Sequence, residues 1–314
     1  MRLNNKIVVI IFVICVFIVY LILRTNINNT NDSVNIKTIL EYAISASEHG
    51  GYAILRNTNY VMVRKKGLTK EGLEDKVTNA DLDSQCSMLS IIKSKFPNLR
   101  IISEESNTVC LNNNENVDTL VPSLDFIDDE WVKSGDITIW IDPLDATHEF
   151  TEKIYEYVTT MVCVAVKGRP VIGVINKPFK NFTSWAWVGK ATSPDLNLRA
   201  EQTRKKMKIS ISRSHSGKIR ELLDNKLKEY ELIMAAGAGY KSLQVAYGDV
   251  DAYLHITAIK KWDICAGNAI LEAVDGKMTD RRNHRIDYSS KTNEINEYGL
   301  IATLKNHLTF VEIL

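Results

Sequence analysis

The chain has 314 residues, of which 45% are apolar and 25% charged, and it contains only 15 Gly and 6 Pro. This composition excludes a disordered, collagen-like or low-complexity chain, and five Cys are too few for a scaffold held together mainly by disulfides. The 39 basic residues nearly balance the 38 acidic ones, so the total charge gives no sign of a nucleic-acid polymer as a partner.

An uninterrupted apolar segment lies at the N-terminus. Ile7 to Leu23 are 17 apolar residues, preceded by Arg2 and Lys6 and followed by Arg24. This length is at the short end of the range for a membrane-spanning helix, ~17 to 25 residues, and no small-residue cleavage site follows it. We therefore expect an uncleaved signal anchor over residues 7–23, a cytoplasmic tail over 1–6, and a lumenal or extracellular remainder.

Residues 24–33 are polar and are expected to form a short stalk. An Asn-x-Ser/Thr triplet, which can be glycosylated only in a lumenal or extracellular chain, begins at each of Asn28, Asn31 and Asn181. Four Cys lie outside the anchor, namely Cys86, Cys110, Cys163 and Cys265. Their spacings match no metal-binding pattern, and both buried thiols and disulfides remain open.

Residues 34–190 are predicted to combine long helices with an antiparallel sheet. Apolar residues recur at helical spacing from Val34 to about Tyr52, and a second helix is expected from about Leu82 to Phe96. Five β-rich runs follow, at Leu99–Ser103, Ile137–Asp142, Thr159–Val166, Val171–Asn176 and Thr183–Val188. Residues 167–170, Lys-Gly-Arg-Pro, are predicted to form a hairpin turn between the third and fourth runs.

Residues 191–314 alternate between predicted strands and helices, which is typical of an α/β layer. The strand-like runs are Lys208–Ile211, Glu231–Ala235 and Ala252–Leu254. The helices are expected near Lys218–Glu229, Lys241–Tyr247 and Asp263–Val274.

Acidic residues gather at the end of one predicted strand, in the string Ile139-Trp-Ile-Asp-Pro-Leu-Asp-Ala-Thr147. Pro143 forces a turn that can bring the carboxylates of Asp142 and Asp145 to one side, with the Leu144 carbonyl pointing into the same space. A simple turn held by its own Asp side chain and capped by Thr147 would explain these residues equally well.

Further acidic residues favour a metal site over a simple turn. Glu104 and Glu105 follow another predicted strand, and Asp263 lies at the start of a predicted helix, near its positive end. Carboxylates that gather without a compensating Lys or Arg repel one another, and a divalent cation relieves that repulsion. Oxygen-only ligands favour Mg²⁺ over Zn²⁺. Since such ions polarise phosphoryl oxygens and activate water, the sequence predicts phosphate hydrolysis.

Four motifs occur in an order that resembles the inositol monophosphatase superfamily of Mg²⁺-dependent, lithium-sensitive phosphatases. They are Val77-Thr-Asn-Ala-Asp81, Ser103-Glu-Glu-Ser106, Trp140-Ile-Asp-Pro-Leu-Asp-Ala-Thr147 and Trp262-Asp-Ile-Cys-Ala-Gly267. The resemblance covers about residues 36 to 305 and implies a layered αβαβα sugar-phosphatase fold of the α+β or α/β class. The details most resemble the 3′(2′),5′-bisphosphate nucleotidases. The anchor, together with Asp145-Ala146-Thr147, is similar to their Golgi-resident members.

The resemblance also implies roles for individual residues. The ligands of two or more Mg²⁺ ions would be Glu104, Asp142, the Leu144 carbonyl, Asp145 and Asp263, with Asp142 bridging two ions. Thr147 and Asp81 would position and deprotonate the attacking water, and Glu105 would hold a further ion or support the other ligands. Many relatives have Gly where this chain has Ala146, and Ala disfavours a positive φ.

Nucleotide contacts are implied in the second half of the chain. Ser210 to Gly217 resembles a nucleotide-binding turn, which implies contacts from Ser212 and His215. The resemblance adds Gly237 and Lys241, although without it Lys241 would be taken as a surface charge. Lys260 and Lys261, beside Trp262, form a basic pair that either attracts a bisphosphate or is simply solvated.

Taken with the anchor, the resemblance implies a single-pass type II protein of the Golgi membrane with a lumenal catalytic domain. It would remove the 3′-phosphate of adenosine 3′,5′-bisphosphate, a by-product of sulfotransferases, to give AMP and phosphate, and would thereby support sulfation. Two alternatives are an inositol (poly)phosphate phosphatase and a catalytically silent, membrane-anchored binding protein. Whether the chain forms a homodimer stays open.

Overall fold

The computed structural model describes residues 14–17, 32–68, 72, 74–110, 121–197, 206–213 and 218–314. Most of the expected anchor over residues 7–23, the stalk before residue 32 and the expected nucleotide contact His215 lie outside these ranges. Within the ranges, no helix has both the length and the apolar composition that crossing a membrane requires.

A six-stranded sheet organises the first part of the fold, in the order β10-β9-β8-β7-β6-β4. Its strands are β4 (Arg100–Ser103), β6 (Ile137–Asp145), β7 (Thr159–Val166), β8 (Arg169–Lys177), β9 (Phe182–Trp187) and β10 (Ala191–Thr192). β4 and β6 are parallel, and the other neighbours are antiparallel. The predicted hairpin between β7 and β8 is confirmed, with Lys167 and Gly168 at positive φ.

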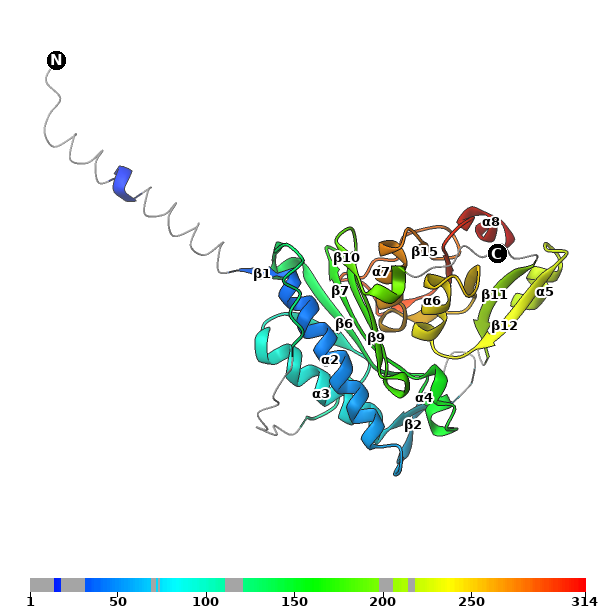
Figure 1. The fold of residues 1–314 in the computed structure, drawn as a ribbon, viewed down its shortest axis with the longest axis horizontal. Helices are drawn as coiled ribbons and strands as arrows, with labels where there is room; N and C mark the ends of the chain where they lie inside the picture. The colour runs from blue at the N-terminus through cyan, green and yellow to red at the C-terminus, as the bar shows by residue number, and fades with distance from the viewer. Residues whose placement is uncertain are drawn as a thin grey trace, which may run out of the picture.

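Two long helices, α2 (Ile36–Arg56) and α3 (Asn79–Lys95), cover one face of this sheet (Figure 1). Their apolar sides pack against alternate residues of β6 and β7, such as Ile139 and Val162. Both helices were predicted, but α3 begins at Asn79, three residues earlier than expected. Thr78 and Asp81 form a capping box that starts the helix there.

A five-stranded sheet, in the order β12-β11-β13-β17-β15, forms the second half of the fold. Its strands are β11 (Met207–Ser212), β12 (Tyr230–Ala235), β13 (Ala252–His255), β15 (Lys277–Thr279) and β17 (Leu300–Thr303). β11 is parallel to β12 and β13, whereas β17 runs antiparallel to β13 and β15. Helices α6 (Ala238–Ala246) and α7 (Lys261–Ala273) lie on one side, and α5 (Ile219–Asp224) and α8 (His307–Ile313) lie on the other.

The helix predicted near Lys218–Glu229 is shorter than expected and ends at Asp224. β12 begins at Tyr230 and runs parallel to β11. The residues between Asp224 and Tyr230 therefore bring the chain back to the edge of the sheet at which β11 also begins.

Three apolar clusters show how the layers pack. One joins α2 and α3 to the first sheet, the second fills the space between the two sheets around α6 and α7, and the third joins the second sheet to α5 and α8. The predicted αβαβα layering is therefore confirmed. The central cluster includes Trp140 and Met161 from the first half and Leu243 and Tyr253 from the second, so the two halves share one core.

Several short elements were not predicted. They are the β2–β3 hairpin (Val63–Leu68 and Glu74–Thr78), the ribbon of β1 (Ser33–Asn35) with β5 (Trp131–Lys133), the ribbon of β14 (Ile259–Lys260) with β16 (Ile295–Asn296), helix α4 (Thr147–Thr151), and the 3-10 helices Ser134–Asp136, Tyr155–Tyr157, Pro178–Lys180 and Pro194–Asn197. Strands β10, β15 and β17 and helix α8 were not predicted either. Most of these are too short or too polar to show a hydrophobic period.

Two disulfides answer the question that the cysteine spacings left open. Cys86 in α3 pairs with Cys110, which follows β4, and Cys163 in β7 pairs with Cys265 in α7. The first bond connects a helix to the segment that carries two of the expected site carboxylates. The second connects the first sheet to the helix that carries Asp263.

Candidate active site

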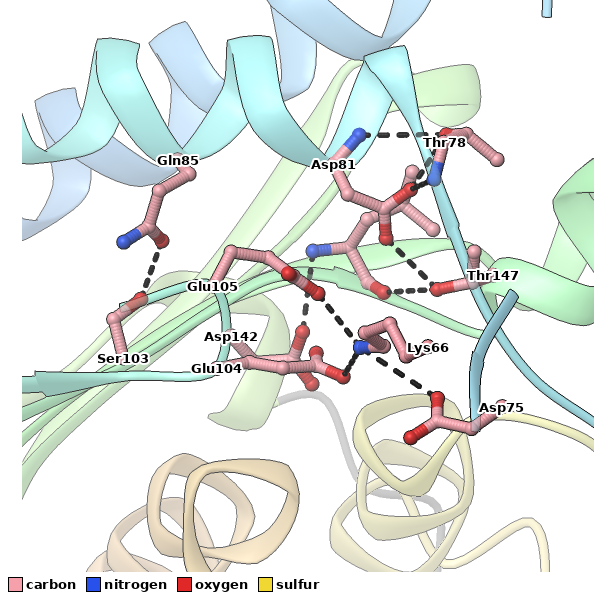
Figure 2. Close-up of polar contacts among 11 residues, drawn as sticks. Lys66, Asp75, Thr78, Asp81, Gln85, Ser103, Glu104, Glu105, Asp142 and Thr147 are labelled. Carbon is pink, nitrogen blue, oxygen red and sulfur yellow. Dashed lines mark hydrogen bonds and ion pairs between the residues drawn. The ribbon is translucent and has the colours of Figure 1, made fainter. Parts of the chain in front are cut away.

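A cavity of about 570 Å³ lies where the ends of β4 and β6 meet the starts of α6 and α7. Seven of the residues expected from the sequence line it, namely Glu104, Asp145, Thr147, Ser212, Gly237, Lys241 and Asp263. Three more, Asp81, Asp142 and Leu144, are almost fully buried. Figure 2 shows part of this cluster around Asp81, Glu104 and Asp142.

Two of the acidic residues occupy the same position in different helices. Asp81 is the third residue of α3, and its Oδ2 accepts hydrogen bonds from Thr78 N at 2.7 Å and from Thr78 Oγ1 at 2.5 Å. Asp263 is the third residue of α7, and its carboxylate accepts the backbone N–H of Lys260, the N-cap residue. At both sites the start of a helix offers N–H groups and a favourable dipole to a carboxylate.

The turn after β6 carries Asp142, Leu144 and Asp145. Asp142 Oδ1 accepts the Leu144 N–H at 3.1 Å, so this Asp does hold its own turn as the simpler interpretation expected. Ala146 then adopts φ 68° and ψ 44°, in the left-handed region, and α4 starts at Thr147. Ala146 thus adopts the positive φ that Ala disfavours, at the junction between the end of β6 and the start of α4.

The simpler interpretation required the Thr147 hydroxyl to cap a helix. In the structure this hydroxyl makes no capping hydrogen bond. It lies 2.9 Å from Asp81 Oδ1 and 3.0 Å from Leu144 O, and it donates its single proton between these two acceptors (Figure 2). Its lone pairs are left to accept a hydrogen bond from another group. The structure therefore brings Thr147 and Asp81, which are 66 positions apart, into direct contact.

Burial controls the titration of the carboxylates. It raises the pKa of Asp81 to about 6, although hydrogen bonds from Thr78 and Thr147 act in the opposite direction. Burial also raises the pKa values of Asp142 and Asp263 well above their usual range, and the charge of Glu104 adds to both shifts. Each of these carboxylates thus makes the ionised form of its neighbours less favourable.

A lysine that the sequence interpretation overlooked compensates part of this negative charge. The Lys66 ammonium, from the β2–β3 hairpin, lies 2.8 Å from Glu104 Oε1, 2.7 Å from Glu105 Oε1 and 3.6 Å from Asp75 Oδ1 (Figure 2). The assumption that the carboxylates gather without a compensating Lys is therefore wrong. Strand β2 is mostly exposed and polar, so only the tertiary structure shows that its lysine reaches the cluster.

Within the described ranges, no group of three or more His, Cys, Asp or Glu side chains is arranged closely enough to hold a metal ion. Glu104 is paired with Lys66, and Asp145 Oδ2 accepts the Gly239 N–H at 2.8 Å, so both carboxylates are engaged elsewhere. The atoms that could bind a metal are nevertheless all oxygen atoms. The ion pairs of Lys66 also show that the cluster accommodates a positive charge. This chemistry fits a hard cation such as Mg²⁺.

The glycine-rich segment at the start of α6 lines the cavity through Ala236, Gly237 and Ala238. Gly237 has φ 66°, and a Cβ there would lie 2.8 Å from Tyr157 O, so a side chain is excluded. Lys241 is 3% exposed and donates to Gly237 O at 2.6 Å. It is not a surface charge, and burial lowers its pKa to about 8. The Gly239 N–H donates to Asp145 Oδ2 and so is not available to a phosphate.

Of the two nucleotide contacts expected near the end of β11, the structure describes only one. Ser212 ends β11, is 7% exposed and lines the cavity. His215 lies outside the described residues. Besides Lys66, the main omission from the sequence interpretation was the Thr-x-x-Asp capping box at Thr78, whose spacing was visible in the sequence.

The chain is similar to known proteins over most of its length. The model of a family described as "Inositol monophosphatase family" matches residues 35–309. Inositol monophosphatase 3 of Xenopus tropicalis is 41% identical over 293 residues, which cover 90% of this chain and 81% of that protein. The Golgi-resident adenosine 3′,5′-bisphosphate 3′-phosphatase of Rattus norvegicus is 39% identical over 294 residues, which cover 89% of this chain and 81% of that protein.

Two solved structures share the fold at low sequence identity. CysQ from Bacteroides thetaiotaomicron, a bacterial member of the inositol monophosphatase family, has a TM-score of 0.63 at 20% identity and covers 86% of this chain and 99% of its own. A Thermotoga maritima IMPase has a TM-score of 0.66 at 20% identity and covers 88% of this chain and 96% of its own.

Proposed function

Because the chain belongs to the inositol monophosphatase family and is a phosphatase, we propose that it removes the 3′-phosphate of adenosine 3′,5′-bisphosphate to give AMP and phosphate. The observation that carries this proposal is that Thr147, with its partner Asp81, lines the same cavity as Ser212, Gly237 and Lys241. The first pair suits water activation, and the other three residues are those at which the sequence resembles nucleotidases.

Thr147 and Asp81 divide the handling of the proton between them. The Thr147 hydroxyl donates toward Asp81 and can accept a hydrogen bond from water with its free lone pairs. As the water attacks phosphorus, its proton passes to Thr147 Oγ1 while the hydroxyl proton moves to Asp81 Oδ1. The pKa of Asp81, about 6, is suited to a base that works near neutral pH.

We propose that Glu104, Asp142, the Leu144 carbonyl, Asp145 and Asp263 would hold two or more Mg²⁺ ions. When bound, Mg²⁺ supplies Lewis-acid stabilisation of the phosphoryl oxygens and lowers the pKa of a bound water. The burial of Asp142 supports this assignment, because an ionised carboxylate at such a site needs compensating positive charge.

We also propose that the chain is a single-pass type II protein of the Golgi membrane, anchored by residues 7–23, where hydrolysis of the sulfotransferase by-product supports sulfation. The Golgi-resident relative supports this location. The two disulfides support an oxidising compartment such as the secretory lumen, because cytosolic proteins rarely keep such bonds.

The test is phosphate release by the full chain in detergent, with adenosine 3′,5′-bisphosphate and inositol 1-phosphate offered side by side, in Mg²⁺ and again in EDTA. We expect a preference for the nucleotide that is lost in EDTA and in the Asp142→Asn variant. A preference for the inositol ester would favour the alternative that the Xenopus relative's name suggests. Nucleotide binding without release of phosphate would favour a silent binding protein.

A further inference from the structure

We propose that Lys260 binds the phosphate group of a nucleoside bisphosphate that is not cleaved, an inference that rests on the function proposed above. A bisphosphate leaves one phosphate outside the reacting centre, and that group carries a charge of about −1.5 to −2 at neutral pH. Selectivity for such a substrate over a monophosphate requires a cation that is not already paired with the carboxylates of the site.

The cavity offers few such cations. Among its described lining residues, the lysines are Lys66, Lys76, Lys241 and Lys260. Lys66 is paired with Glu104 and Glu105, and Lys241 is buried in the floor, where it donates to a backbone carbonyl. The Lys76 ammonium donates a hydrogen bond to Nδ1 of His148 at 3.2 Å.

Lys260 differs from the other three lysines in its surroundings. It is exposed at the rim, and its ammonium lies 4.8 Å from the centre of the Trp262 ring. Among the residues that the structure describes, it makes no direct ion pair with a carboxylate, although its charge attracts the carboxylate of Asp263 at longer range. The ring contact holds the charge without neutralising it, so less conformational freedom is lost when an anion binds.

The structure also separates the two members of the basic pair. Lys261 is 5% exposed, and its ammonium donates to Thr292 Oγ1 at 2.6 Å, away from the cavity lining. Lys260 lies in β14, one residue before α7, where its backbone N–H is held by Asp263. The Lys260 ammonium is thus carried by the same segment as one of the expected metal ligands, which keeps it near the place of the reacting phosphate.

Apolar residues complete this wall of the cavity. Ile259, Trp262 and Ile295 line it beside Lys260, and β14 is paired with β16 in a short antiparallel ribbon. The Lys260 ammonium therefore lies at the exposed edge of an apolar wall, with one side against the Trp262 ring and the other open to an incoming anion. We infer that this wall, rather than the carboxylate cluster, distinguishes bisphosphates from monophosphates.

The experiment compares kcat/KM for adenosine 3′,5′-bisphosphate with that for adenosine 3′-monophosphate, using the full chain and its Lys260→Met variant. We expect the ratio of the two values to fall about tenfold or more, the size typical of a lost charge-assisted hydrogen bond. Lys260→Arg should keep most of the ratio because it keeps the charge. Lys76→Met, which removes a charge from the same cavity, is the matched control and should leave the ratio close to that of the wild type.

Three results would overturn the inference. An equal loss for both substrates would mean that Lys260 acts through Asp263 and not on the second phosphate. If the ratio fell as much in Lys76→Met as in Lys260→Met, the second phosphate would be attracted by the total positive charge of the cavity and not by Lys260 in particular. A wild-type chain that prefers inositol 1-phosphate would refute the proposed function and this inference with it. Since this result needs only the wild type, it is distinguished from the two results above, which need the variants.

Binding of AMP and of adenosine to each variant, measured by calorimetry in EDTA, provides a check that does not depend on turnover. AMP carries the uncleaved phosphate and adenosine does not. Lys260→Met should therefore weaken AMP binding selectively, and an unchanged affinity for AMP would contradict the inference.

Discussion

Removing the buried charge of Asp81 should change how the stability of the metal-free protein depends on pH. Asp81 is fully buried, and its pKa is about 6 in the folded protein against an ordinary value of 3.8. Since each unit of difference corresponds to about 1.36 kcal/mol, the ionised carboxyl costs the folded state about 3 kcal/mol at pH 7.5. The Asp81→Asn variant does not carry this cost.

The sign follows from the raised pKa. Between pH 6 and 3.8 the folded protein binds more protons at Asp81 than the unfolded chain does, so acidification stabilises the wild type through this group. The free energy of unfolding of the wild type should therefore rise relative to that of Asp81→Asn as the pH falls from 7.5, by about 2 kcal/mol at pH 4.5 and about 3 kcal/mol at lower pH. Hydrogen bonds lost in the variant shift the difference by an amount that does not vary with pH.

A buried histidine acts in the opposite direction but cancels from the comparison. Burial lowers the pKa of His307 to about 4, so this group destabilises the fold as the pH falls below 6.5. It is present in both proteins, and only the difference between them is used. The ionised Asp81 also raises the pKa of Glu104 and Asp142, which adds to the expected effect in the same direction.

The assay is urea unfolding in EDTA, followed by tryptophan fluorescence, at pH values from 7.5 to 4.5. The protein contains five tryptophans, and all of them lie in the part of the chain that the structure describes. A wild-type-minus-variant difference that is independent of pH, or that changes in favour of the variant on acidification, would refute the account of Asp81 as a buried carboxyl with a raised pKa.

Three further predictions concern the same site and its supports. Ala146→Gly should raise the free energy of unfolding by about 0.5–1 kcal/mol in thermal or urea melts. The substitution relieves the left-handed strain at φ 68°, and this gain exceeds the cost of the extra freedom of Gly in the unfolded chain. A loss of stability would contradict this. Thr147→Val should lower kcat by about 100-fold or more with a small change in KM, whereas Thr147→Ser should retain most of the rate; comparable rates for Val and Ser would show that the hydroxyl has no role in proton transfer. Replacing Cys163 and Cys265 together by Ala should cost about 2–4 kcal/mol in urea unfolding, because their bond closes a long loop between β7 and α7; an unchanged midpoint would mean that the bond does not contribute.

Local signals in the sequence predicted much of the fold. The helical spacing of Ile36, Ile39 and Leu40 indicated α2, and Lys-Gly-Arg-Pro indicated the hairpin between β7 and β8. Such features depend on neighbours within one or two turns, so they can be read without knowing the rest of the structure. The capping box at Thr78 is equally local and could have corrected the start of α3.

The sequence by itself determined which acidic residues gather at the site, because the order of the four motifs resembles one family. Only the tertiary structure decided which charges are paired. Lys66 reaches Glu104 from 38 positions away, Lys241 is buried, and Lys260 and Lys261, adjacent in sequence, have opposite environments. The disulfide partners were settled in the same way. The physical reason is that burial and charge pairing depend on contacts between segments far apart in the chain, whereas periodicity and turn chemistry depend on neighbours.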